Sequence, residues 1–313
     1  MTPAIQTNQL QKRYGSHTAV QGLNLTVEPG SVFGLIGPNG AGKTTTLRML
    51  LDIIRPTAGT ATVLGEDPRT GGPALRRRIG YIPGELRLEG RVRGDHLLQH
   101  YADISGSVAP RAIENLAERF GLDLSRQVRT LSKGNKQKLG LVQAFMHQPE
   151  LLVLDEPTSG LDPLVQREFL QMVLEARQNG QTVLLSSHVL SEIQQAADAV
   201  AVLSAGRIVA EGDVATLRLG SIRRLNVSLA DTDAVAVRSS LAGISQLRDL
   251  EVTEGVVVRV IATVEGDIDR VVKAIAEHRV VDLDVEQPDL EESVLSLYGP
   301  ANATTTPEEA NRA

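Results

Sequence analysis

The chain has 313 residues, of which 42% are hydrophobic and 22% charged, and its formal net charge is −6. These values are ordinary for a globular protein of one or two domains with a substantial core. The acidic balance argues against a duplex-binding surface, so we expect no nucleic-acid partner. The absence of cysteine excludes disulfides, thiol nucleophiles and cysteine metal sites. We expect neither a secretory signal nor a membrane span, because residues 1–6 lack a signal pattern and no apolar run approaches about 18–20 residues.

The first 36 residues alternate short apolar stretches with turns. Residues 4–10 and 23–27 are predicted to be strands, and the turn at 28–30 leads into a third apolar run at 31–36. Tyr14 lies between the first two strands. An isolated tyrosine is more often core or surface filler than a ligand contact, so alone it carries no functional prediction.

A phosphate-binding loop follows the third apolar run. The pattern G-x-x-x-x-G-K-[ST] is matched at every fixed position by Gly37, Pro38, Asn39, Gly40, Ala41, Gly42, Lys43 and Thr44. A strand, a glycine-rich turn and a helix N-terminus direct backbone N–H groups at one point, which suits a polyphosphate. Lys43 is expected to bind the outer phosphates and the Thr44 hydroxyl to ligate Mg²⁺, with Thr45 in the same nucleotide-binding set.

The middle of the chain is mostly helical in pattern. Residues 76–85 indicate a basic helix end running into a short strand, and residues 95–122 indicate helices interrupted near Gly106 and Pro110. Another helix is expected after Leu131, with apolar residues at helical spacing behind it. Ser132 at its start is predicted to be the N-cap.

A second strong signal is the run at 151–156. Four apolar residues followed by Asp155 and Glu156 describe a buried parallel strand whose carboxyl end carries two acids. Because burying two carboxylates without partners is costly, a nearby cation explains them. Asp155 is predicted to hold Mg²⁺ and Glu156 to accept hydrogen bonds from the attacking water. A strand that simply ends in a solvated acidic turn is the alternative, and the phosphate loop makes it much weaker.

A turn at 159–163, a helix at 164–179 and a strand at 181–187 come next, and His188 stands just past that strand. A lone histidine is more often packed or on the surface. Since this one follows a strand of the same sheet edge as Asp155, we predict that it belongs to the site. Residues 199–209 are predicted to form a hairpin.

The C-terminal part predicts a small α+β domain of ferredoxin-like, βαββαβ order. Its expected elements are a strand at 224–229, a helix at 234–241, strands at 247–252 and 256–261, a helix at 267–277, a strand at 280–285 and a short helix at 288–295. Residues 301–313 are polar and expected to be disordered. Nothing in this part has a catalytic pattern, so a role in stabilising or docking a dimer is favoured.

Five elements of the first part stand in one order: Tyr14, 37–44, 131–137, 151–162 and His188. This order resembles the nucleotide-binding domain of ATP-binding cassette (ABC) proteins. The resemblance implies an α/β P-loop NTPase fold with a mixed sheet core, an antiparallel β edge and a helical subdomain. The expected domains are an ABC ATPase domain at 4–218, with the helical subdomain at about 85–148, and an accessory domain at 222–299.

The resemblance also assigns a signature motif at Ser132, Lys133, Gly134 and Asn135. Ser132 and Gly134 match the commonest form, Leu-Ser-Gly-Gly-Gln, whereas Lys133 and Asn135 depart from it. In the family two cassettes close head to tail. Ser132 and Gly134 would therefore contact the γ-phosphate of ATP held by a second subunit.

Further roles follow from the same resemblance. Tyr14 would stack on adenine, His188 would hold the γ-phosphate, and Asp162 in the D-loop would communicate across the dimer, with Lys43, Glu156 and His188 as the catalytic set. One position departs from the family: Gly84 stands where a glutamine usually reaches Mg²⁺ and the membrane subunit. We hypothesise that Glu85 or a water substitutes, and that coupling to the transporter is altered.

The resemblance implies the ATPase subunit of an exporter of the ABC-2 type, which moves a drug, antibiotic or lipid. Such a subunit uses ATP and Mg²⁺, forms a homodimer, and binds a separate permease at the cytoplasmic face of the membrane. One alternative is a soluble ABC protein of translation or DNA repair. Another is a P-loop GTPase, since residues 135–138 imitate the guanine-reading Asn-Lys-x-Asp, but Lys138 stands where the aspartate is required.

Overall fold

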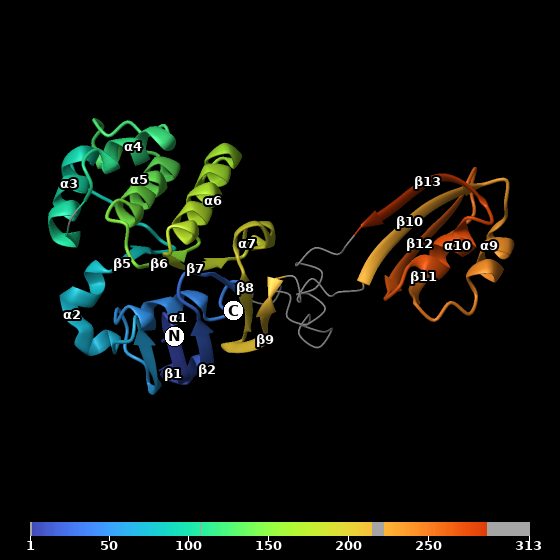
Figure 1. The fold of residues 1–313 in the computed structure, drawn as a ribbon, viewed down its shortest axis with the longest axis horizontal. Coiled ribbons are helices and arrows are strands. Elements are labelled where there is room, and N and C mark those ends of the chain that lie inside the picture. Colours follow the sequence, from blue (N-terminus) through green and yellow to red (C-terminus); the bar gives the residue numbers. More distant parts are fainter. Residues whose placement is uncertain (1, 107, 215–221, 287–313) are drawn as a thin grey trace, which may run out of the picture. The chain divides into compact units, whose positions relative to one another are not determined.

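The computed structural model describes residues 2–106, 108–214 and 222–286. The chain divides into two compact units, residues 1–214 and 215–313, and each is considered by itself (Figure 1). Among the described residues, no helix combines the length and the apolar character that a bilayer span requires.

The first unit is built on a six-stranded sheet with the order β5-β6-β7-β3-β8-β9. These strands are β3 Val32–Ile36, β5 Ile79–Ile82, β6 Leu151–Asp155, β7 Thr182–Ser187, β8 Ala199–Ser204 and β9 Arg207–Asp213. All pairs are parallel except β8 with β9, which forms the predicted hairpin. Every residue of β3, β6 and β7 is buried, which explains why their sequences are continuous apolar runs rather than alternating ones.

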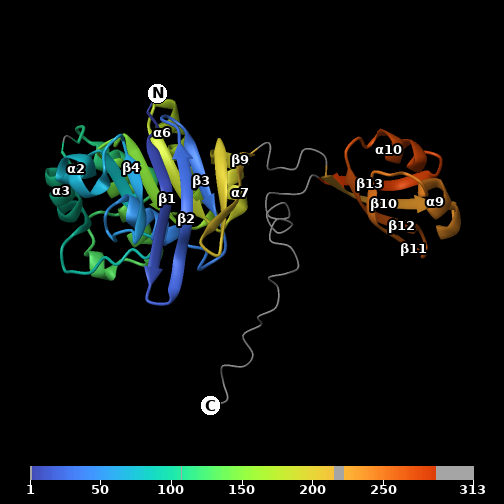
Figure 2. The same ribbon diagram turned by 90° about the horizontal axis from the view of Figure 1, so that it is seen from below.

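A three-stranded antiparallel sheet, in the order β2-β1-β4, forms the β edge of this unit (Figure 2). Its strands are β1 Ile5–Tyr14, β2 His17–Val27 and β4 Ala58–Val63. The strands expected at 4–10 and 23–27 are thus parts of longer ones. Register shifts in β1 between Thr7 and Arg13 interrupt the alternation of apolar and polar residues, so the alternation stops before the strand does.

The helices of the first unit are α1 Lys43–Leu50, α2 Pro68–Arg77, α3 Gly94–Ser105, α4 Ala112–Arg119, α5 Lys133–Phe145, α6 Pro163–Gln178 and α7 Leu190–Ala196, with a 3-10 turn at Val128–Thr130. Figure 1 shows α3, α4 and α5 gathered on the side of the six-stranded sheet opposite β1 and β2. The interruption predicted near Gly106 is confirmed: this residue caps α3 with a φ of 109°.

The register of the parallel strands brings three loops together. Ile36 of β3 pairs with Ser187 of β7, and Asp155 of β6 pairs with Ser186. The chain therefore leaves three neighbouring strands at one edge of the sheet, and ligands of open α/β sheets bind at such carboxyl edges.

The second unit has one sheet of order β11-β12-β10-β13, antiparallel throughout. Its elements are β10 Ile222–Ala230, α9 Ala234–Leu241, β11 Leu247–Thr253, β12 Val258–Glu265, α10 Asp269–Ile275 and β13 Arg279–Glu286. This is the ferredoxin-like order that was predicted. The third strand begins at Val258 rather than at 256, because Val256 lies fully exposed in the preceding turn. The helix expected at 288–295 and the tail at 301–313 lie outside the described residues.

Candidate nucleotide site

The loop between β3 and α1 has the conformation that a phosphate cradle requires. Gly42 caps α1 with a φ of 106°, in the left-handed region that favours glycine. A Cβ on Gly37 would lie 2.3 Å from the carbonyl oxygen of Leu203, so this residue can only be glycine. Helix α1 begins at Lys43, and the N–H groups of its first turn have no partners within the helix. They are available to an anion.

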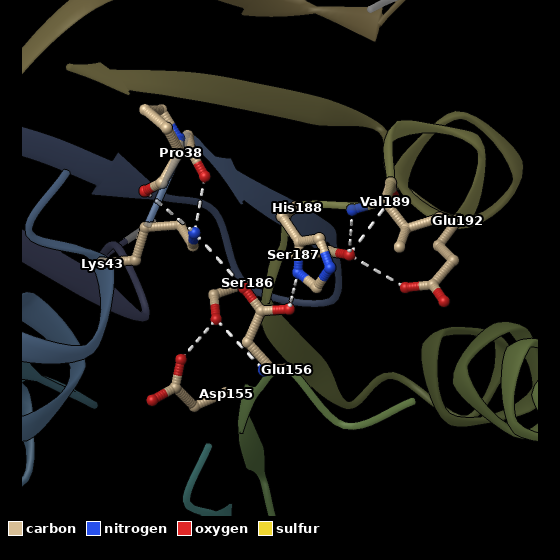
Figure 3. Close-up of polar contacts among 10 residues, drawn as sticks. Pro38, Lys43, Asp155, Glu156, Ser186, Ser187, His188, Val189 and Glu192 are labelled. Carbon is tan, nitrogen blue, oxygen red and sulfur yellow. Dashed lines mark hydrogen bonds and ion pairs between the residues drawn. The ribbon is translucent and has the colours of Figure 1, made fainter. Parts of the chain in front are cut away.

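Lys43 lies folded into this loop and is nearly buried. Its Nζ donates to the carbonyl oxygen of Gly37 at 2.5 Å and to that of Pro38 at 3.4 Å. The same ammonium lies 3.2 Å from Oε1 of Glu156, and only 6% of the Lys43 side chain is exposed (Figure 3). The loop carbonyls and Glu156 thus compensate the charge of Lys43 at the position where a phosphate is expected to bind.

Asp155 ends β6 and is completely buried. Its Oδ1 accepts a 2.6 Å hydrogen bond from Ser186 Oγ, whereas its Oδ2 is buried without a hydrogen-bond partner. Burial, and next the negative charge of Asp155, raise the pKa of Tyr81 on the neighbouring strand above its ordinary value. A buried carboxylate oxygen with no partner is a position where a cation is expected.

Glu156 and His188 form a pair in front of Lys43. Oε2 of Glu156 is hydrogen bonded to Nδ1 of His188 (Figure 3). Glu156 has a φ of 48°, uncommon for a residue other than glycine, and this turns its side chain away from that of Asp155. The two adjacent acids therefore have separate partners.

A hollow of about 310 Å³ extends from Lys43 and Glu156 to the aromatic residue predicted to contact adenine. Its lining consists of Tyr14, His17, Ala19, residues 38–45 and Glu156. The Tyr14 ring is 49% exposed, and Lys12 Nζ lies 5.0 Å from its centroid. The structure thus brings Tyr14, the phosphate loop with Thr44 and Thr45, and Glu156 into one concave surface.

The predicted signature residues lie at the start of α5. Ser132 is the N-cap, as predicted, and its hydroxyl accepts a 3.2 Å hydrogen bond from Asn135 N. A Cβ on Gly134 would lie 2.8 Å from the carbonyl oxygen of Gly160, so the helix start packs closely on the D-loop. Gln137 strengthens this contact by donating to the Pro157 carbonyl at 2.8 Å. These residues do not line the hollow that contains Lys43.

Asp162 caps α6 through bonds from the N–H groups of Leu164 and Val165, both 3.1 Å long. Gly84 lies directly against Asp155, because a Cβ there would be 3.1 Å from Oδ2. The carboxylate of Glu85 is not brought to that position. It is 73% exposed and pairs with Arg87 at 2.8 Å.

Several residues of the site were not singled out in the sequence. Ser186 orients Asp155 and also accepts a 3.2 Å bond from Glu156 N, while Ser187 and Glu192 lie behind His188. A polar pair ending an otherwise apolar strand was the available signal for the two serines. No sequence signal marked Glu192, because its partners either are far away in the sequence or become its neighbours only through the turn after β7.

Residues 20–159 match the ABC transporter family. The bacitracin transport ATP-binding protein BcrA of Bacillus licheniformis is 34% identical over 304 residues, 96% of this chain and 98% of the relative. The daunorubicin/doxorubicin resistance ATP-binding protein DrrA of Streptomyces peucetius is 37% identical over 325 residues, 99% of this chain and 97% of the relative.

Solved structures agree with these relatives. The ATP-binding subunit of an ABC transporter superposes with a TM-score of 0.64 at 30% identity, covering 69% of this chain and 92% of that one. A dimeric ATP-binding cassette bound to ADP and phosphate gives a TM-score of 0.60 over 67% of this chain and 98% of that one, and at 18% identity it supports the fold alone.

The chain belongs to the ABC transporter family. It is an ATP-binding subunit and an ATPase, as the resemblance of its motifs implied. The predicted fold class is confirmed as well. The GTPase interpretation is wrong, because residues 135–138 lie in helix α5 within the part of the chain that matches the ABC transporter family.

Proposed function

We propose that this chain energises an ABC exporter, hydrolysing ATP to move a drug, antibiotic or lipid through a separate membrane permease. The observation that carries the proposal is the similarity to BcrA and DrrA along nearly the whole chain, the C-terminal unit included. A soluble ABC protein of translation or DNA repair is not favoured by these relatives. The proposed location is the cytoplasmic face of the membrane, where the permease is reached.

ATP binding begins with an exchange at Lys43. The triphosphate takes the place of the loop carbonyls and of Glu156 around the ammonium, and the first-turn N–H groups of α1 bind the phosphate oxygens. Tyr14 supports the adenine at the other end of the hollow. Both ends of the nucleotide are then held by residues of one subunit.

Mg²⁺ fits the oxygens present at the carboxyl end of β6. Asp155 Oδ2, buried without a hydrogen-bond partner, and the Thr44 hydroxyl would hold the ion, with water and phosphate as the remaining ligands. No group of three or more acidic, histidine or cysteine ligands is found in the described part of the chain, as suits an ion bound largely through phosphate. The ion supplies charge neutralisation on the phosphates.

Hydrolysis requires a water in line with the bond between the β- and γ-phosphates. Glu156, released from Lys43, accepts a hydrogen bond from that water and orients it, and His188 contacts the γ-phosphate. The water oxygen bonds to the γ-phosphorus while one proton of the water passes to Glu156, the bond to the bridging oxygen breaks, and ADP and phosphate leave. Catalysis is mainly positioning and charge stabilisation.

The signature residues complete the site in trans. Ser132 and Gly134 start a helix that does not line the subunit's own hollow, so we propose that they bind the γ-phosphate held by a second copy. Their close contact with the D-loop next to Asp162 couples the two halves of a head-to-tail dimer. Closure on ATP and opening after hydrolysis then move the permease.

The test is affinity purification from the native host in mild detergent, followed by mass spectrometry and an ATPase assay of the eluate. We expect a multi-spanning permease to co-purify, and ATPase activity to be lost in Glu156→Gln but not in Glu150→Gln. Glu150 is a matched control because it lies just before β6, at the end of the strand opposite Glu156, and pairs with Arg78. Recovery of ribosomal or DNA-repair proteins would support the alternative function.

A further inference from the structure

Glu192 is a buried acid that the hydrolysis scheme does not use. It lies in the first turn of α7 and is only 4% exposed. Its Oε2 accepts a 2.9 Å hydrogen bond from Ser187 Oγ, while its Oε1 is buried without a hydrogen-bond partner. Burial, and to a lesser degree the charge of Glu156, raise the pKa of Glu192. A half-paired buried carboxyl group opposes folding, so a role beyond packing is expected.

Ser187 connects Glu192 to the backbone on both sides of His188. Val189 N donates a 2.9 Å hydrogen bond to Ser187 Oγ, and this hydroxyl in turn donates to Glu192 (Figure 3). His188 is the residue between the two bonded neighbours. The direction in which its ring leaves the end of β7 therefore depends on the hydroxyl that Glu192 holds.

The same carboxyl group reaches the loop after β6. The Thr158 side chain, only 5% exposed, faces the carboxyl group of Glu192 and favours its ionised form, which opposes the effect of burial on the pKa. Thr158 follows Glu156 by two residues, and the positive φ of Glu156 is a conformation that its surroundings must maintain. One buried side chain thus contacts the loops that carry both members of the Glu156–His188 pair.

We infer that Glu192 is a positioning residue for ATP hydrolysis, tying the loop of His188 to the loop of Glu156 so that both side chains meet the γ-phosphate and the water in one geometry. The inference rests on the roles proposed above for these two residues. Glu192 is not part of the lining of the nucleotide hollow. Its removal should therefore lower turnover and leave ATP binding unchanged.

The experiment measures kcat and KM for ATP, the affinity for a fluorescent ATP analogue, and Tm, on the purified full chain. Glu192→Ala should lower kcat on the order of 10²-fold, the effect of a small misplacement of reacting groups. KM and analogue affinity should change by no more than about twofold. Glu192→Gln keeps an oxygen that accepts from Ser187 and should restore kcat to within about tenfold of the parent. Gln195→Ala, exposed on the same helix, is the control.

Two outcomes would overturn the inference while the parent hydrolyses ATP. One is a kcat of Glu192→Ala within about threefold of the parent, a loss much smaller than a misplaced catalytic group would cause. The other is a parallel loss of kcat, analogue affinity and Tm, which marks a merely structural residue. A parent chain without ATPase activity would instead refute the proposed function, and the inference with it.

Two further variants keep the test decisive if Glu192→Ala does not fold. Thr158→Val removes only the link to the β6 loop and should lower kcat about tenfold, with analogue affinity retained. Ser187→Ala removes the hydroxyl that Glu192→Gln still bonds, so kcat should fall further in Ser187→Ala than in Glu192→Gln, with analogue affinity retained. An unchanged kcat in Ser187→Ala or in Thr158→Val would overturn the inference.

Discussion

Replacing Glu156 by glutamine should tighten ATP binding while it stops hydrolysis. Glu156 Oε1 lies 3.2 Å from Lys43 Nζ, and the two side chains are 18% and 6% exposed. A phosphate oxygen that takes the place of the carboxylate on this ammonium lies about 6 Å from the displaced carboxylate, the summed length of two ionic contacts. The variant lacks the repulsion between these two negative charges.

The structure sets the magnitude. Two unit charges about 6 Å apart interact by roughly 0.7 kcal/mol in bulk water and by roughly 2.8 kcal/mol at an effective dielectric constant of about 20. The hollow is open on one side, so the two values bracket the site. ATP affinity should rise by about 3- to 100-fold, with about tenfold as the central expectation. Hydrolysis should fall by about 10²- to 10⁴-fold, the usual contribution of a general base.

The assay is equilibrium binding of a fluorescent ATP analogue at low and high salt, with single-turnover hydrolysis measured beside it. The gain in affinity should shrink as salt screens the partly exposed charges. Glu150→Gln removes the same charge at the other end of β6 and should change neither affinity nor rate. An unchanged or weaker affinity in Glu156→Gln, or an equal gain in Glu150→Gln, would refute the reasoning.

Four further changes test other parts of the chain. Glu85→Ala should leave the Mg²⁺ dependence of the ATPase within about twofold, because its carboxylate is 73% exposed and paired elsewhere; a weaker response to Mg²⁺ would show that Glu85 serves the ion. Gly134→Ala places a Cβ 2.8 Å from the carbonyl oxygen of Gly160, in the loop before Asp162, so ATPase activity should fall more than the affinity for the ATP analogue. An equal fall in both would contradict this prediction. Arg119→Ala removes ion pairs with two glutamates of α6, and because these side chains are about one-third exposed, urea unfolding should show a loss of about 1 kcal/mol or less. Glu192→Gln should raise Tm more at about pH 7 than at about pH 5, because burial raises the pKa of Glu192 in the folded parent. The parent loses stability as the pH rises from 4.5, the pKa of this side chain in the unfolded chain, through the raised value, whereas the amide of the variant does not titrate. Equal Tm shifts at both pH values would speak against that assignment.

The parts of the site that lie along a single strand and its loop could be predicted from the sequence. The phosphate loop, Asp155 and His188 each follow an apolar run, and parallel strands place such ends at one edge. Tyr14 could be assigned only through the resemblance to ABC proteins. The functional roles of these residues stay predictions that the variants above test.

Contacts between distant segments could not be predicted. The approach of Gly134 to Gly160 depends on how α5 packs against the loop after β6, and neither glycine shows this in its local pattern. The placement of Glu85 is a similar case. Its spacing after β5 allowed it to replace the absent glutamine, but the turn brings Gly84 against Asp155 and leaves Glu85 with Arg87. Local spacing does not determine which of two adjacent side chains faces a buried neighbour.

We propose that the pairing of Lys43 with Glu156 links nucleotide binding to the activation of water. Lys43 is almost without solvent contact, so its charge needs acceptors, and in this structure the loop carbonyls and Glu156 provide them. A bound phosphate supplies a stronger acceptor and frees one oxygen of Glu156. The other oxygen remains bonded to His188, whose backbone is held through Ser187. In the proposed mechanism the carboxylate is therefore released toward water only when the γ-phosphate is present.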